Sequence, residues 1–160
     1  MSAEKQPEGT AALRTNEKKW SKALMDAGWT ALPSVIIENQ RQLALSPLDI
    51  NIVLYLASKW WNAEGKPFPS KSTMAKAMAV HPRTIQKHVQ ALEGAGFIRR
   101  EERRTPAGSK TNIYHLDGLI EAAKPFAAEK LAEMQDKAEM TKRRQNRRGA
   151  PKLRLVDDEE

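Results

Sequence analysis

The segment Pro82–Glu93 restricts the fold of this chain more than any other, because its side chains divide between two opposite faces. At about 100° per residue, a helix here places its apolar side chains together on one side. These are Ile85, Val89 and Leu92. The opposite side carries long basic and amide side chains, namely Arg83, Gln86, Lys87 and Gln90. Such a helix must pack against a core and present its polar side to solvent.

Residues around this segment predict a second short helix before it and a hairpin after it. Ser70 is a typical N-cap for a helix over residues 71–78, and only residues 79–81 separate that helix from the next. Gly94 and Gly96 end the two-faced helix. Residues 97–104 and 111–116 then have the composition of paired strands, with a tip at 105–110 that contains Pro106 and Gly108. Two short helices followed by a hairpin is the order of a winged helix-turn-helix.

Further helices are predicted on both sides of this region. Ser46 and Pro47 start a helix that continues to about Trp61 and supplies the centre of the core, and shorter helices are expected at 20–27 and from Ser34. We therefore expect a mainly α fold with a small β-hairpin wing and helical extensions at both ends. Residues 1–19 are predicted to be a disordered arm, 20–117 the domain with its helical lead-in, and 118–160 a basic helical tail with an acidic end, interrupted or restarted at Pro125.

Charge is concentrated in the predicted wing and two-helix region. The 160 residues carry a net charge of +7, and residues 70–116 hold nine Lys or Arg against three acids. A basic excess of this kind favours a polyanionic partner. The absence of cysteine excludes a disulfide framework, cysteine-ligated zinc and a thiol nucleophile.

The run PSKSTMAKAMAVHPRTIQKHVQALEGAGFIRREER, closed by NIYHL, resembles a known family. It is similar to the winged helix-turn-helix DNA-binding proteins of bacterial plasmids, phages and integrated elements, including the N-terminal domains of phage replication initiators and DnaD-like proteins. The resemblance covers about residues 46–117. It implies that Pro82–Glu93 enters the major groove and that Asn112 and Tyr114 fix the wing. One position departs from the pattern, because many relatives have glycine where this chain has Ala79.

We predict three groups of DNA-binding residues. Bases are read by Arg83, Thr84, Gln86, Lys87 and Gln90, because these side chains donate to guanine or pair with adenine. Phosphates are held at the start of the first helix and along the wing by Ser70, Lys71, Ser72, Arg99, Arg100, Arg103, Arg104 and Lys110. The tail contributes Arg143, Arg144, Arg147 and Arg148. The plainer alternatives are an ordinary solvated helix face, wing arginines paired with Glu101 and Glu102, simple capping by Ser70, and a solubility tail.

Further expectations concern partners and other chemistry. Apolar or small residues spaced by alternating steps of four and three (127, 131, 134, 138, 141) favour a homodimer through a short coiled coil, and the tail could instead bind a replication or transcription protein. The four tryptophans are assigned to the core, with single-strand binding as a minor alternative. Neither the three histidines nor the acid pairs form a metal or catalytic constellation, so no cofactor, no metal and no enzyme activity are expected.

The sequence thus predicts a cytoplasmic bacterial protein, associated with the nucleoid or a plasmid, that binds double-stranded DNA and no membrane. The favoured function is a transcriptional repressor of a plasmid, phage or integrated element. The alternative is a replication-initiation or plasmid-maintenance protein that binds origin repeats. A winged helix that binds only other proteins is a remote third possibility.

Overall fold

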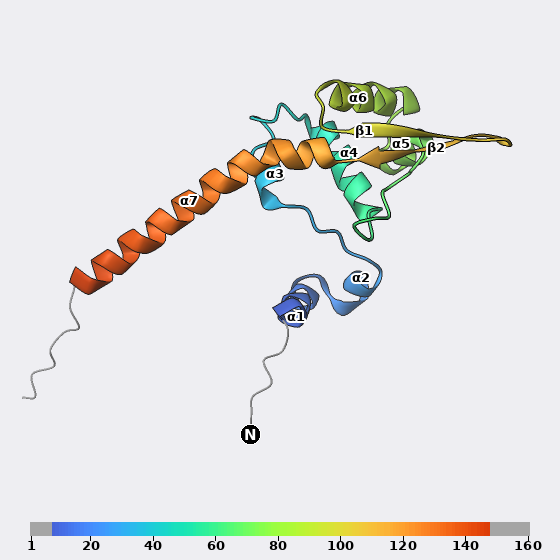
Figure 1. Ribbon diagram of the computed structural model, residues 1–160. Helices are drawn as coiled ribbons and strands as arrows, with labels where there is room; N and C mark the ends of the chain where they lie inside the picture. The colour runs from blue at the N-terminus through green and yellow to red at the C-terminus, as the bar shows by residue number, and fades with distance from the viewer. Residues whose placement is uncertain (1–7, 148–160) are drawn as a thin grey trace, which may run out of the picture.

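The computed structural model describes residues 8–147, which are mainly helical with one two-stranded antiparallel hairpin, as predicted (Figure 1). In chain order the elements are α1 (Glu8–Trp20), α2 (Lys22–Asp26), α3 (Ser34–Glu38), α4 (Pro47–Ser58), α5 (Lys71–Met78), α6 (Pro82–Gly94), β1 (Arg99–Thr105), β2 (Gly108–His115) and α7 (Asp117–Arg147). This order is that of a winged helix-turn-helix with helical extensions.

One hydrophobic core joins α4, α5, α6, the base of the hairpin and the first turns of α7. Its centre is α4, whose Ile52, Val53 and Leu56 are fully buried. The predicted apolar side of α6 packs against it, since Ile85, Val89 and Leu92 are all buried. From the other elements come Met74, Ala75, Ile98, Tyr114, Leu116, Leu119 and Ala123. Burial of this set is the main favourable contribution to folding.

The three central helices begin at the predicted residues, and Ser46 and Ser70 act as the predicted caps. The Ser46 side chain accepts from the Asp49 N–H at 3.2 Å, and the Asp49 carboxylate accepts from the Ser46 N–H at 2.8 Å. This reciprocal pair satisfies two N–H groups that a helix start leaves free. Ser70 caps α5 by accepting from the Thr73 N–H, and His81 caps α6 by accepting from the Arg83 N–H.

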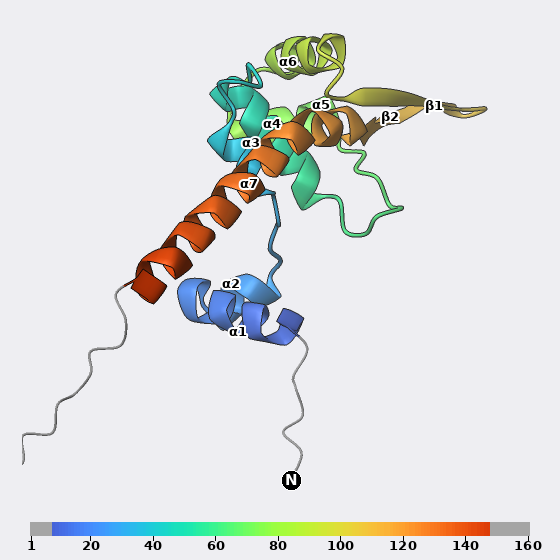
Figure 2. The same ribbon diagram turned by 60° about the vertical axis from the view of Figure 1, so that its left-hand side comes forward.

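The hairpin projects from the core as a wing. Arg99 pairs with His115 at its base and Thr105 with Gly108 at its tip, with an irregularity between Glu101 and Arg103. Its strands extend nearer the tip than the sequence predicted. The wing is anchored by Tyr114, which is buried and whose N–H donates to the Pro67 carbonyl at 2.9 Å. The loop over 59–70 therefore passes beneath the wing, on the side away from α6 (Figure 2).

The predicted disorder of residues 1–19 is wrong for residues 8–19, which belong to α1. Residues 11–19 are rich in good helix formers, and α1 packs against α2, so the segment is helical without a regular apolar period. The helix expected over 20–27 is present as α2 but shorter, because Trp20 ends α1. Ser21 has a left-handed backbone (φ 81°), which separates α1 from α2.

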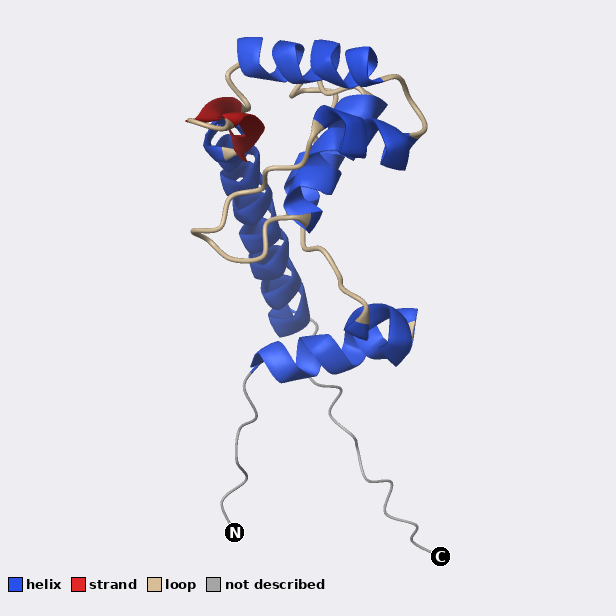
Figure 3. Ribbon diagram, turned by 90° about the vertical axis from the view of Figure 1, so that its right-hand side faces the viewer, coloured by secondary structure: helices blue, strands red, loops and turns tan. Residues whose placement is uncertain are grey.

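Helix α7 runs without interruption through Pro125, contrary to the expected break. Ala123 is buried and Phe126 packs against the core, so contacts on both sides of the proline hold the helix together. At its start the Leu119 N–H donates to the Phe97 carbonyl, and further along Lys130 pairs with Glu38 of α3. Beyond these contacts α7 extends away from α6 and from the wing (Figure 3).

The tryptophans correct another expectation, because three of the four are exposed. Trp20, Trp29 and Trp61 expose 64%, 54% and 74% of their surface, and Trp60 alone packs against the core. The apolar stretches around them predicted burial, but the three lie in the N-terminal lead-in and in the loop after α4, outside the core. These three exposed indole rings are available to contact a binding partner.

The turn between α5 and α6 generates a stability prediction. Ala79 has φ 54° and ψ 41°, the left-handed conformation that glycine adopts more readily. Replacing Ala79 with glycine should raise the free energy of unfolding by about 1 kcal/mol. The matched control is Ala77→Gly inside α5, which should lower it by a similar amount because glycine disfavours a helix interior. Urea unfolding measures both, and a destabilised Ala79→Gly variant would contradict the assigned turn conformation.

Candidate nucleic-acid interface

The solvent-facing side of α6 carries the predicted base-reading residues. Arg83, Gln86, Lys87 and Gln90 are exposed and line one shallow hollow on this face. Thr84 is half-buried at its edge. The structure therefore brings Arg83, Gln86, Lys87 and Gln90 onto one surface, opposite the buried Ile85, Val89 and Leu92, with Thr84 on its flank. A protruding helix with such a face has the size and hydrogen-bonding groups to enter a major groove.

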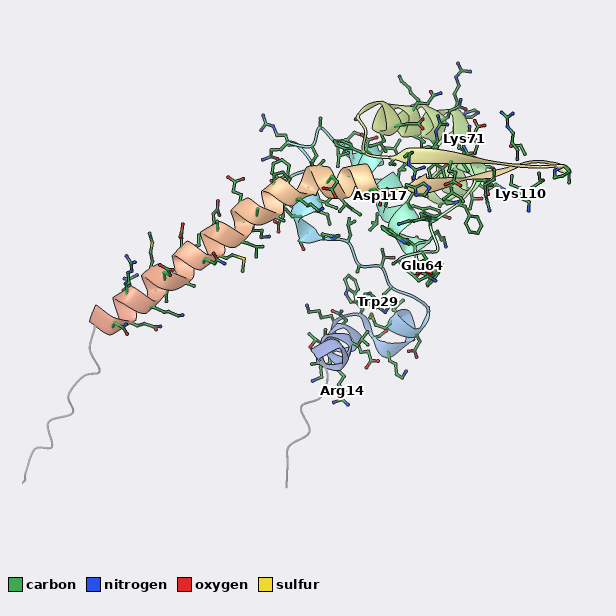
Figure 4. All side chains as sticks on the ribbon, viewed as in Figure 1. Arg14, Trp29, Glu64, Lys71, Lys110 and Asp117 are labelled. Carbon is green, nitrogen blue, oxygen red and sulfur yellow. The ribbon has the colours of Figure 1, made fainter. Side chains whose placement is uncertain are left out.

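A second hollow joins the start of α5 to the wing. Its lining includes the cap residue Ser70, Lys71 from α5 and Lys110 from β2. Figure 4 shows Lys71 and Lys110 on the side of the molecule from which the wing projects. The Lys71 ammonium also donates to the Gln86 side chain at 3.3 Å, which links this hollow to the α6 surface. Two lysines beside free N–H groups of a helix start provide a suitable environment for a phosphate.

The wing arginines do not act as one group. The Arg100 guanidinium donates to the Glu93 carboxylate at 2.8 Å and so ties β1 to the end of α6. This bond lowers the pKa of Glu93 and raises that of Arg100. Arg104 pairs with Glu102 at 3.2 Å, and both side chains are largely exposed. The alternative of internal pairing therefore holds for Arg100, with Glu93 as an unexpected partner, and for Arg104.

The other three wing cations have different surroundings. Arg103 lies over the Phe68 ring, 4.6 Å from its centre, and donates to the Thr111 carbonyl at 2.8 Å. Arg99 and Lys110 are exposed, and among the described side chains neither has an ion-pair partner. Arg99 and Lys110 are thus the wing cations most available for phosphate contacts.

The tail arginines are not brought to this surface. Arg143 and Arg144 are exposed near the far end of α7, which points away from α6 (Figure 1). Arg143 lies 3.7 Å from the carboxylate of Glu139. The side chain of Arg147 and the whole of Arg148 lie outside the described residues.

A hydrogen bond between side chains that sequence analysis missed positions α6 on α4. His88 Nδ1 lies 2.8 Å from Asp49 Oδ1, and Asp49 is the one charged residue buried among the described side chains. Burial opposes ionisation and is the largest influence on the pKa of Asp49, but the bonds from Ser46 and His88 together lower it. The spacing Ser46-x-x-Asp49 already predicts a capping box; the contact with His88 needs the folded arrangement.

The comparisons with known proteins agree with this geometry. Residues 43–98 match the model of a helix-turn-helix domain. Among solved structures, the N-terminal domain of DnaD protein from Geobacillus kaustophilus HTA426 has a similar fold, with a TM-score of 0.51 and 21% identity over 74% of this chain and 96% of that chain. No curated protein matches.

The fold and site define a class of protein. Residues 43–98 match a helix-turn-helix domain, and with the β1–β2 wing the chain has a winged helix-turn-helix fold similar to that of the DnaD N-terminal domain. Within the described part of the chain, no helix is long and apolar enough to cross a membrane. Over the same residues, no group of three or more His, Cys, Asp or Glu side chains is placed to hold a metal ion.

The Asp49–His88 contact generates a pH prediction. Because folding lowers the pKa of Asp49, this group stabilises the fold above its ordinary value of 3.8, and the contribution is lost as pH falls through the folded pKa. The wild-type free energy of unfolding should therefore fall as the pH is lowered below about 5, and an Asp49→Asn variant should show a smaller fall.

The control for this experiment is Asp136→Asn, which removes an exposed carboxylate from α7. Its unfolding free energy should follow the wild-type curve over the whole pH range. Urea unfolding at a series of pH values measures all three proteins. An Asp49→Asn curve parallel to that of the wild type would show that Asp49 does not contribute through its charge.

Proposed function

We propose that this protein binds double-stranded DNA with sequence preference, with α6 in the major groove and the wing over the adjacent backbone. The observation that carries the proposal is the exposed face of Arg83, Gln86, Lys87 and Gln90 opposite the buried face of the same helix. Arginine and lysine donate to guanine O6 and N7, and glutamine pairs with adenine N6 and N7. Thr84, which is half-buried on the flank of this face, would contact a thymine methyl group or the backbone.

Phosphate contacts complete the proposed interface. Ser70, Lys71 and Ser72 at the start of α5, with Arg99 and Lys110 on the wing, provide charge and N–H donors on the flanks of α6. Such contacts fix the register of a protein on the duplex but carry no sequence information directly. Arg100 serves instead to tie β1 to the end of α6 through Glu93, and Arg104 has its charge partly balanced by the exposed Glu102 of the same strand.

The biological role that we propose is transcriptional repression of a plasmid, phage or integrated element, by occlusion of a promoter. Occlusion needs only tight, sequence-dependent binding and no catalytic step. A homodimer on repeated half-sites would double the readout. Leu131 and Met134 of α7 support a homodimer, because both are more than half exposed and their spacing is that of a coiled coil.

A second candidate function is replication initiation or plasmid maintenance at origin repeats. The observation that favours it is the direction of α7, which extends away from the proposed DNA surface and so could hold a replication protein beside the bound site (Figure 3). Footprinting of the promoter region and of the origin distinguishes the two functions. Protection confined to the promoter supports repression, whereas protection confined to origin repeats supports initiation.

Removing the side chains of the α6 face should weaken and broaden DNA recognition. Arg83→Ala and Lys87→Ala should each cost about 1–3 kcal/mol of binding free energy on the selected site and much less on unrelated duplexes. Titration of both duplexes at several salt concentrations measures this difference. The matched control is Arg143→Ala with Arg144→Ala, which removes two exposed cations from the far end of α7. It should leave the preference between the two duplexes unchanged.

The result that would contradict the assignment is equally specific. If Arg83→Ala and Lys87→Ala weaken the selected and unrelated duplexes by the same factor, α6 contributes only charge. Base readout would then have to come from another surface.

A further inference from the structure

Exposed aromatic rings line a hollow beneath the wing, on the opposite side of the hairpin from α6. The hollow has a volume of about 410 Å³ and is formed by the end of α4, the loop over 59–70 and the start of α5. Trp61 and Phe68 form its rim with 74% and 56% of their surface exposed, and Tyr55 lies half-buried in its wall. Large exposed rings gathered around one hollow are typical of a binding site rather than of ordinary protein surface.

Cations surround these rings and their neighbour Trp60. The Lys59 ammonium lies 5.5 Å from the centre of the Tyr55 ring, and the Lys66 ammonium lies 4.3 Å from that of Trp60. Arg103 of the wing covers Phe68. The loop has one acid, Glu64, which leaves the region with a positive excess. The hollow therefore offers flat apolar faces and positive charge together, which suits a ligand that is both aromatic and anionic.

The lining also distinguishes between kinds of ligand. Among the described residues that form this hollow, none is leucine, isoleucine, valine or methionine. Grooves that receive an amphipathic helix rely on adaptable aliphatic side chains, whereas nucleobases stack on tryptophan, tyrosine and phenylalanine. The chemistry of the lining favours a nucleobase.

The aromatic hollow is continuous with the proposed phosphate site at the start of α5. Pro69 lines both hollows, and next to it the phosphate site contains Ser70, Lys71 and Lys110. The bond from the Tyr114 N–H to Pro67 holds the aromatic loop against the wing. A nucleic-acid strand with a phosphate beside Lys71 and Lys110 would thus have the aromatic rings within the reach of an adjacent unpaired base.

We propose that Trp61, Phe68 and Tyr55 form a stacking site for unpaired bases of single-stranded DNA, with the strand's phosphates on Lys71 and Lys110. The placement of the phosphates rests on the proposed DNA-binding function, but the stacking site does not depend on base readout by α6. The two surfaces lie on opposite sides of the wing, so a duplex on α6 and an unpaired strand beneath the hairpin can be held by one molecule (Figure 2).

The test uses a fluorescently labelled oligothymidylate of about 12 nucleotides, a length within the range of known single-strand sites. Fluorescence anisotropy measures its affinity for the full chain and for three variants. Trp61→Ala should weaken binding about tenfold or more, because a stacked base loses its partner. Trp61→Phe keeps a flat ring and should retain most of the affinity. Trp20→Ala removes a similarly exposed indole from α1 and should bind as the wild type does.

Two further measurements keep the inference falsifiable. The unfolding midpoint of Trp61→Ala should match that of the wild type, since this side chain is largely exposed. If that variant proves unstable, Lys59→Ala, which changes an exposed residue of the same hollow, should lower oligothymidylate affinity instead. Equal binding by the wild type and a folded Trp61→Ala variant, or equal losses in Trp61→Ala and Trp20→Ala, would overturn the stacking site.

The double variant Arg83→Ala with Lys87→Ala separates this inference from the proposed function. It should lose preference for the selected duplex and still bind oligothymidylate. A protein that shows no duplex preference but binds oligothymidylate in a Trp61-dependent manner would contradict the proposed function and support the stacking site. Loss of oligothymidylate binding in the double variant, to the same extent as in Trp61→Ala, would place the single strand on α6 and overturn the inference.

Discussion

The burial of one side of α6 is the constraint on which the rest of the structure depends. Ile85, Val89 and Leu92 leave water by packing into the core against α4 and α5, and this fixes which side of the helix remains in solvent. The contact between His88 and the buried Asp49 adds a directional restraint, because an ionised carboxylate in this position needs its partners. Packing and the contact between His88 and Asp49 together orient the exposed α6 face that carries Arg83, Gln86, Lys87 and Gln90.

The wing divides the remaining surface into two regions with different chemistry. On the α6 side the exposed groups are hydrogen-bonding and basic, which suits the edges of paired bases. Beneath the hairpin they are aromatic and basic, which suits the faces of unpaired bases. Both regions meet at the start of α5, where Lys71 contacts Gln86 on one side and Pro69 borders the aromatic hollow on the other.

Local chemistry explains which features the sequence could predict. Ser46, Ser70 and Pro82 start helices through bonds or backbone preferences within a few residues, so the three central helices and the reading face of α6 follow from pattern alone. Contacts between side chains distant in sequence do not follow from a local pattern. The pairing of Arg100 with Glu93 depends on how the hairpin returns to the end of α6.

The tryptophans show where a sequence pattern misleads. The apolar stretches around them predict burial, but the structure leaves Trp20, Trp29 and Trp61 exposed. Exposing the ring of Trp61 to water costs free energy. Trp61 nevertheless stays exposed, because it follows the end of α4 and lies beyond the last helical turn that reaches the core. Periodicity identifies the buried face of a long amphipathic helix and gives no such information for a loop. Three-dimensional placement was therefore needed to recognise the aromatic hollow.

The joint between the wing and α7 has a mechanical consequence. Only Leu116 separates β2 from α7, and a Cβ at Gly118 would lie 1.7 Å from the Gly96 carbonyl oxygen, so backbone rests directly on backbone there. The 31-residue helix has a length of about 46 Å. Leu119 and Ala123 are also buried in the core and Lys130 pairs with Glu38 of α3, so the first part of α7 is fixed to the domain and sets the direction in which its distal part projects.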